Sequence, residues 1–153
     1  MNQAEVIEDA ALDKITIGPP AHPSFDDSIV GIDGPLEIMP AVNLLISLGR
    51  RRSLLDFATG VLEQSGVAIN DTAFFYPTVG LDFGEGLYPG VLIHDPLDQI
   101  YARPPVFERL AARFFRAVIN VATRRSDPTL QQPWWPEFVA AVGQIEQRVD
   151  SQA

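Results

Sequence analysis

Residues 87–124 read LYPGVLIHDPLDQIYARPPVFERLAARFFRAVINVATR. The runs 87–93 and 97–102 are rich in β-forming residues and flank a turn at 94–96, so they predict a β-hairpin. After two prolines, apolar side chains recur at helical spacing over 105–124: Phe107, Leu110, Ala111, Phe114, Val118, Val121 and Ala122. A hairpin and an amphipathic helix can bury their apolar faces against each other, so we expect residues 87–124 to form a hairpin–helix unit at the centre of the fold.

The sequence on both sides of this unit predicts further helices and strands. One helix is expected over 40–49 and a second over 53–66, each ended by a glycine and joined to the other by three arginines as a helical hairpin. A strand is expected over 72–76, followed by glycine-rich turns, and a last helix over 133–149. These elements indicate a single α+β domain over 1–153, in which a small antiparallel β-sheet packs against several α-helices.

The N-terminal region, residues 1–35, is predicted to be irregular and acidic. A short helix is expected over Ala4–Leu12, and short strands over 14–17 and 28–32. Prolines and glycines are frequent in the rest of this region, which predicts loops between these short elements.

The chain is acidic, and its charge is unevenly distributed. The net charge is −9, of which residues 1–100 contribute −11 and residues 101–153 contribute +2. Acidic proteins repel nucleic acids and anionic lipids, whereas they attract basic proteins and accelerate association with them. We therefore expect a basic protein partner and neither a nucleic acid nor a membrane. Solubility alone is the alternative explanation of this acidity.

The cellular compartment is indicated by what the sequence lacks. It contains no cysteine, which excludes disulfides and thiolate metal sites and fits a reducing compartment. The first residues are acidic and unlike a signal peptide, and the apolar runs are too short to span a membrane. We expect a cytoplasmic protein.

Catalytic chemistry has one candidate group, in which His94 adjoins Asp95 and Asp82 supplies a further carboxylate. A histidine oriented by a carboxylate can act as a general base, so a small hydrolase is one alternative function. However, adjacent residues of a strand or tight turn point in different directions, and no Gly-x-Ser-x-Gly elbow is present. The other histidine, His22, does not complete a metal-ligand spacing. We expect no catalytic residue, no metal and no cofactor.

Two further groups of side chains have a structural and a functional interpretation. Arg109, Arg113 and Arg116 share one face of the expected central helix, where they can bind an acidic surface or pair internally with the acidic half of the chain. We favour internal pairing. Trp134 and Trp135 can close the core or anchor an interface. A structural or assembly module that homodimerises through these tryptophans or through a sheet edge is therefore the other alternative function.

The central stretch also resembles a known protein family. Its pattern is a bulky residue followed by x-Gly-Val and apolar residues, a tight turn, a second strand and a Phe-x-x-Leu helix. The matching segments here are Tyr88-Pro89-Gly90-Val91-Leu92-Ile93, Gln99-Ile100-Tyr101-Ala102 and Phe107-Glu108-Arg109-Leu110. This pattern resembles that of the immunity proteins of bacterial contact-dependent growth inhibition systems.

The resemblance implies a small acidic α+β protein without catalytic residues. Such a protein binds and blocks the toxic C-terminal domain, often a ribonuclease, of the secreted protein from its own system. Nucleases are commonly basic because they bind phosphates, so acidic side chains on loops are expected to contact the toxin. The expected partner-binding residues are Asp82, Glu85, Asp95, Asp98, Asp26, Asp27 and Asp33.

Overall fold

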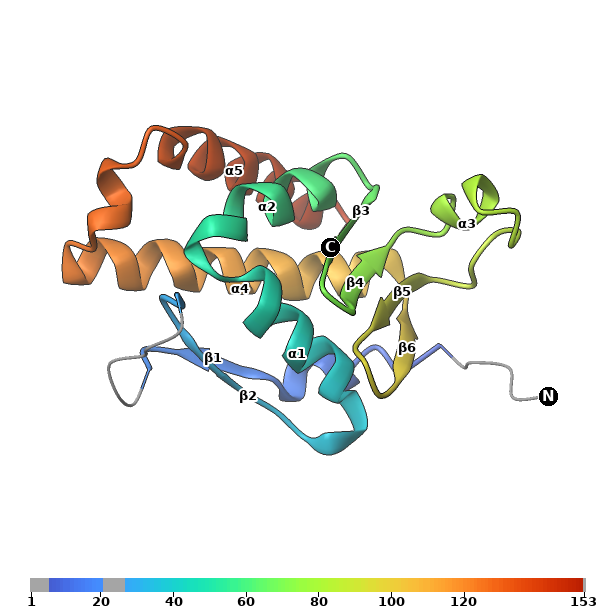
Figure 1. Ribbon diagram of the computed structural model, residues 1–153. Coiled ribbons are helices and arrows are strands. Elements are labelled where there is room, and N and C mark those ends of the chain that lie inside the picture. Colours follow the sequence, from blue (N-terminus) through green and yellow to red (C-terminus); the bar gives the residue numbers. More distant parts are fainter. Residues whose placement is uncertain (1–5, 21–26, 153) are drawn as a thin grey trace.

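Helix α4 (Pro104–Arg125) runs through the centre of the computed structural model, which describes residues 6–20 and 27–152 (Figure 1). Pro104 and Pro105 occupy its first turn, where the missing N–H groups need no partner. Ser126 ends the helix in the left-handed conformation, with φ of 51°. The predicted helix over 105–124 is confirmed, and its apolar stripe is buried from Phe107 to Ala122.

Four strands form an antiparallel sheet in the order β3-β4-β5-β6: β3 (Gly66–Ile69), β4 (Thr72–Phe75), β5 (Val91–His94) and β6 (Gln99–Ala102). The predicted strand at 72–76 and the hairpin formed by β5 and β6 are confirmed. The prediction that the first hairpin strand begins at Leu87 is wrong, because β5 begins at Val91. Pro89 has no N–H to donate to a ladder, which explains the later start.

Three further helices lie around α4: α1 (Met39–Leu48), α2 (Leu54–Leu62) and α5 (Trp135–Ser151). Short 3-10 turns join the elements: η2 (Leu36–Ile38), η3 (Arg51–Ser53) and η4 (Pro128–Gln131). The predicted helices are confirmed, but α2 ends at Leu62 and not at Gly66, which is the first residue of β3. Helix α1 packs on β4 and β5, whereas α2 packs on α5, so these two helices do not form the expected helical hairpin.

The N-terminal region is more regular than the sequence predicts. It contains a 3-10 turn, η1 (Ala11–Lys14), and a two-stranded antiparallel ribbon of β1 (Thr16–Gly18) and β2 (Gly31–Asp33). The strands expected at 14–17 and 28–32 therefore exist with shifted boundaries. The expected helix over Ala4–Leu12 is wrong in its described part, because Val6 forms a bridge with Tyr101 beside β6.

The two faces of the four-stranded sheet differ sharply. On the inner face, Phe74, Ile93 and Ile100 are in register across β4, β5 and β6, and all three belong to the main hydrophobic core with residues of α1, α2, α4 and α5. The four longer helices lie mainly on one side of the sheet, and the short helix α3 (Val79–Asp82) lies on the other (Figure 1). The helical layer is therefore one-sided.

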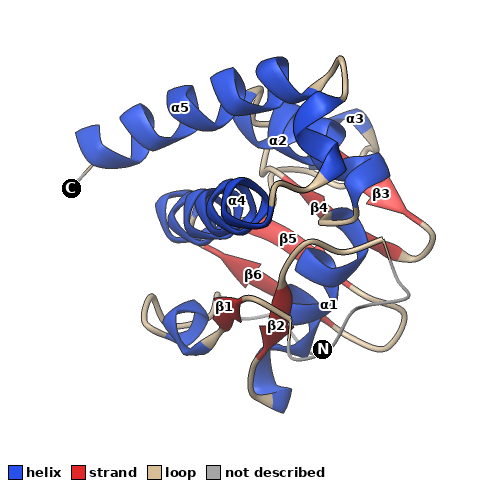
Figure 2. Cartoon of the chain, turned by 90° about the vertical axis from the view of Figure 1, so that its left-hand side faces the viewer, coloured by secondary structure: helices blue, strands red, loops and turns tan. Residues whose placement is uncertain are grey.

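Helix α4 meets the sheet only near its N-terminus. The ring of Phe107 lies 5.0 Å from that of Phe74, between ring centroids. Further along the helix, the Phe114 ring packs 5.8 Å from that of Phe57 in α2. The four rings of these two contacts are buried, and the expected packing of the apolar face of the helix against the hairpin is correct only for the first turns. Viewed along α4, α5 lies above the helix, the four-stranded sheet beside it and the β1–β2 ribbon below it, while its remaining side is open (Figure 2).

Candidate functional site

The face of the sheet opposite the core is the first component of the candidate site. We define this outer face by Ala73, Phe75, Leu92, His94 and Tyr101, which alternate with the core residues along their strands. Ala73 and Leu92 are buried but lie outside the main core cluster. The outer face is therefore built from apolar and aromatic side chains that the long helices do not cover.

The second component is the 77–90 segment, which connects β4 to β5 and carries α3. Its backbone is closed on itself, because the N–H of Tyr88 donates to the carbonyl of Pro77 at 3.2 Å and that of Glu85 donates to the carbonyl of Gly80 at 2.9 Å. Gly80 is needed for this closure, since a Cβ there would lie 2.3 Å from the carbonyl oxygen of Gly86. The segment is thus a structured loop that extends away from the helices (Figure 1).

Large apolar side chains project into solvent from this loop. The exposed fractions are 57% for Leu81, 63% for Phe83 and 66% for Leu87. Aromatic contacts join the loop to the outer face: the rings of Phe83 and Phe75 lie 6.2 Å apart, and those of Tyr88 and Tyr101 lie 6.1 Å apart. Exposed apolar side chains that are held together in this way are typical of a protein-binding surface.

Two of the predicted acidic residues lie on the same loop, and both are exposed. Asp82 is the last residue of α3, and Glu85 follows it in the turn. The hydroxyl of Tyr88 donates to Glu85 Oε2 at 2.6 Å, and this hydrogen bond raises the pKa of Tyr88 to about 12. Apolar and acidic groups therefore alternate along the 77–90 segment, with Glu85 fixed in orientation by the tyrosine.

The next two predicted residues, Asp95 and Asp98, both belong to the β5–β6 turn, but they differ in exposure. Asp98 is exposed, and its Oδ1 accepts the N–H of Gln99. Asp95 is buried, and its carboxylate accepts the amide of Asn43 at 2.7 Å and the N–H groups of Leu97 and Asp98 at 2.9 Å each. Burial alone would raise the pKa of Asp95, but these hydrogen bonds outweigh it and lower that pKa below the usual range. Asp95 thus stabilises the turn.

The His94–Asp95 arrangement differs from a base with its orienting carboxylate. The ring of His94 lies on the outer face, with its centroid 6.1 Å from that of Phe75. The Asp95 oxygens are occupied by Asn43 and by the turn backbone. Asp82, the third member of the hydrolase alternative, lies in α3 on the 77–90 segment.

Of the remaining predicted residues, Asp27 and Asp33 lie outside the 77–90 segment and the β5–β6 turn. Asp26 is outside the described residues. Asp27 lies 3.5 Å from Arg51 and accepts the N–H of Arg52, so its charge is used within the protein. Arg51 also pairs with Asp127 at 2.7 Å, and this hydrogen-bonded pair lowers the pKa of Asp127 to about 2. The predicted acidic residues therefore do not form one face.

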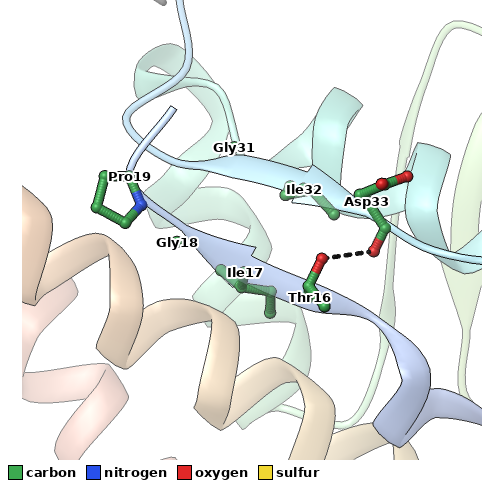
Figure 3. Close-up of a pocket in the computed structure, with 7 residues that line it drawn as sticks. All are labelled: Thr16, Ile17, Gly18, Pro19, Gly31, Ile32 and Asp33. Carbon is green, nitrogen blue, oxygen red and sulfur yellow. Dashed lines mark hydrogen bonds between the residues drawn. The ribbon is translucent and has the colours of Figure 1, made fainter. Parts of the chain in front are cut away.

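Asp33 borders a shallow hollow of about 410 Å³ on the β1–β2 ribbon. Figure 3 shows that the hollow is lined by the residues of the two strands and by Pro19, with the Thr16 hydroxyl donating to the Asp33 carbonyl at 3.4 Å. The Asp33 carboxylate accepts the N–H of Gly34 at 2.8 Å. Among the described residues, Asp33 is the only ionisable side chain that lines this hollow, so this part of the chain supplies no pair of groups for catalysis there.

Arg109, Arg113 and Arg116 of α4 all interact within the protein, but only Arg109 forms the expected ion pair with the acidic half of the chain, residues 1–100. Arg109 lies 3.4 Å from Asp13, Arg113 donates to two backbone carbonyls of the η1–β1 connection, and Arg116 forms an ion pair with Glu146 of α5.

At the other end of the molecule, Trp135 is buried against Phe138 with ring centroids 5.2 Å apart. The core interpretation of Trp135 is therefore confirmed.

A buried charged network was missed by the sequence analysis. Glu108 of α4 is fully buried and accepts two hydrogen bonds from Arg148 at 2.9 Å, one from Tyr76 at 2.5 Å and one from Gln64 at 3.2 Å. Arg148 also donates to the last two carbonyls of α2. Burial and the Glu108 hydrogen bond raise the pKa of Tyr76 above its usual range. A carboxylate next to Phe107, within an apolar helical stripe, was the available signal.

Comparisons of the chain with protein-family models, with curated proteins and with solved structures found no match. None of the described helices combines the length and the apolar composition that a membrane crossing requires. Among residues 6–20 and 27–152, no three histidine, aspartate or glutamate side chains are grouped as a metal site would need. The geometry of the described residues identifies the 77–90 segment, together with the outer face, as the candidate site.

Proposed function

We propose that this protein is a binding module that recognises a basic protein through the 77–90 segment and the adjoining outer face. The observation that carries the proposal is the exposure of Leu81, Phe83 and Leu87 on a loop closed by its own hydrogen bonds. Because the loop is already ordered, a partner that buries these side chains has little conformational entropy to remove. Asp82 and Glu85 beside them favour a partner of positive charge.

Within this class, the proposed role is that of a cytoplasmic immunity protein that neutralises a cognate toxin domain. The toxin class that we favour is a nuclease. Three arguments support it: the resemblance of the central stretch, the charge of −11 in residues 1–100, and the acidic loop beside an apolar patch. A nuclease active site must attract phosphates, so an acidic inhibitor can occupy it by charge complementarity. Inhibition of this kind requires no catalytic group from the inhibitor.

The proposal is tested with the C-terminal domain of the protein that the neighbouring gene encodes. Association and dissociation rates are measured at low and high salt for the wild type, for a double variant with Asp82→Lys and Glu85→Lys, and for Phe83→Ala. The charge reversal should slow association by about tenfold at low salt and flatten its salt dependence. Phe83→Ala should mainly accelerate dissociation, by about thirtyfold if Phe83 is a central anchor.

A matched control uses another exposed leucine and its acidic neighbour. Leu36 is 82% exposed in η2, and Glu37 beside it is also exposed, so Leu36→Ser with Glu37→Lys alters comparable groups away from the loop. This control should bind like the wild type. If a real complex forms with rates that the loop variants leave unchanged, the proposed surface is wrong. If the neighbouring gene product does not bind at all, the immunity role is wrong.

A further inference from the structure

The two edges of the four-stranded sheet are not equivalent. At the β6 edge, the chain before η1 runs alongside the strand, and the N–H of Ile7 donates to the carbonyl of Tyr101 at 2.8 Å. At the other edge, β3 pairs with β4, and no second strand neighbours β3 within the described residues. An uncovered edge strand is a template on which another extended chain can pair.

Backbone groups of β3 are oriented for such pairing. The N–H of Tyr76 donates to the carbonyl of Ser65 at 2.8 Å, and in an antiparallel ladder the bonded residues alternate. The N–H and C=O groups of Gly66 and Ala68 therefore point to the free edge. Ala68 is also exposed, so a chain can reach these groups.

A groove of about 290 Å³ lies between helix α2 and the first half of β3, where Gly66 and Val67 line it. Gly60 allows the helix to lie this close, because a Cβ there would be 2.6 Å from Val67 Cγ2. The groove thus combines a free strand edge on one side with a helix on the other, which is a geometry that suits an extended peptide.

The charges of the groove determine which peptide fits. Asp56 of α2 and Glu63, just after it, line the groove, and both side chains are exposed. Neither forms an ion pair within the described part of the chain. Other carboxylates of the protein, such as Asp127 and Glu146, are paired with arginines. Basic side chains of a bound strand would find partners here. A second copy of this chain would instead bring equal charges together.

We propose that the β3 edge and the α2 groove bind an extended basic segment of a partner protein, which adds to the sheet as a fifth strand beside β3. The surface differs from that of the 77–90 segment, so this inference stands whether or not the proposed immunity role is correct. The bound segment is extended and positively charged. The backbone of Gly66 and Ala68 supplies affinity, and Asp56 and Glu63 supply selectivity.

The test uses a fluorescent eight-residue peptide of alternating lysine and valine, with a glutamate–valine counterpart and a version whose backbone nitrogens are alternately methylated. Binding to the full chain is followed by fluorescence anisotropy, and amide shifts are mapped by NMR. The lysine peptide should bind and shift Gly66 and Ala68. The glutamate and methylated peptides should bind at least tenfold more weakly. Binding without shifts in β3 would overturn the proposal, as would equal binding of the methylated peptide.

Variants of the protein sharpen this test. Ala68→Pro removes an N–H that the sheet itself does not use, so the fold should persist while peptide binding falls at least tenfold. Ala68→Thr is the control that keeps the N–H and should bind normally. Asp56→Lys with Glu63→Lys should also lose binding, whereas Asp82→Lys with Glu85→Lys should retain it. If only the latter pair abolishes binding, or if Ala68→Pro disrupts a dimer, the edge does not bind a basic segment.

Discussion

The buried Glu108–Arg148 pair gives the sharpest prediction about stability. Glu108 is 0% exposed and Arg148 is 27% exposed, by side chain, so only the arginine can turn to water when its partner is removed. Arg148→Met should therefore cost about 3–5 kcal/mol, because it leaves a carboxylate buried without its cation. Glu108→Gln keeps the shape of the side chain and should cost less, about 1–3 kcal/mol, since Arg148 can be partly solvated.

A third variant and a double variant complete this experiment. Tyr76→Phe removes a hydrogen bond to a charged acceptor and should cost about 1.5–3 kcal/mol. The double variant with Glu108→Leu and Arg148→Met replaces the pair by apolar side chains and should be more stable than Arg148→Met alone, because no charge remains buried. With the single variant Glu108→Leu measured as well, the four proteins close a double-mutant cycle, in which the two residues should show a large coupling energy.

The measurement is equilibrium unfolding in urea, in which the midpoint should shift while the slope with denaturant stays constant. Asp150→Asn, at an exposed position of α5, is the control and should change the free energy of unfolding by less than about 0.5 kcal/mol. Two results would refute the reasoning: equal costs for Arg148→Met and Glu108→Gln, or strictly additive effects in the double variant. Either would mean that Glu108 is not held as a buried anion by Arg148.

Two further predictions concern stability at other positions. The pKa of Asp127 is lowered to about 2 by its pairing with Arg51, so this carboxylate should contribute about 2 kcal/mol above pH 4, lost as the pH falls towards 2. Asp127→Asn should reduce the pH dependence of the unfolding free energy between about pH 5 and 2, and an unchanged pH profile would contradict the pairing. Phe114 is fully buried between Phe57 and Gly49. Phe114→Ala should cost about 3–5 kcal/mol in urea unfolding, and a loss below about 1 kcal/mol would contradict its place in the core.

The strongly periodic parts of the fold were predictable from the sequence. Helix α4 carries its apolar residues at helical spacing, and its position in the core follows directly from that pattern. The hairpin was predictable in kind but not in extent, because β propensity extends through Leu87 and Tyr88 into residues that the structure uses for a loop. Pro89, which has no N–H to donate to a ladder, was the local signal against a strand there, but the prediction gave more weight to the β-forming residues around it.

The candidate site was only partly predictable. Asp82 and Glu85 were found as charges on a glycine-rich connection, but the exposure of Leu81 and Phe83 was not, because this segment has no periodicity that separates inner from outer side chains. Asp95 illustrates the opposite failure. Its neighbours in sequence suggested chemistry or a partner, whereas its carboxylate is used by Asn43, which is 52 residues away in the chain.

The buried network and the candidate site are connected through Tyr76. This tyrosine is the last residue before the 77–90 segment, and its carbonyl accepts the N–H of Val79 in the first turn of that segment. Its hydroxyl is held by Glu108 in the centre of the helical layer. The point from which the loop leaves the sheet is therefore tied to α4 and, through Arg148, to α5 and the end of α2. A loop whose stem is fixed in this way can present exposed apolar side chains in one arrangement, as the proposed binding function requires.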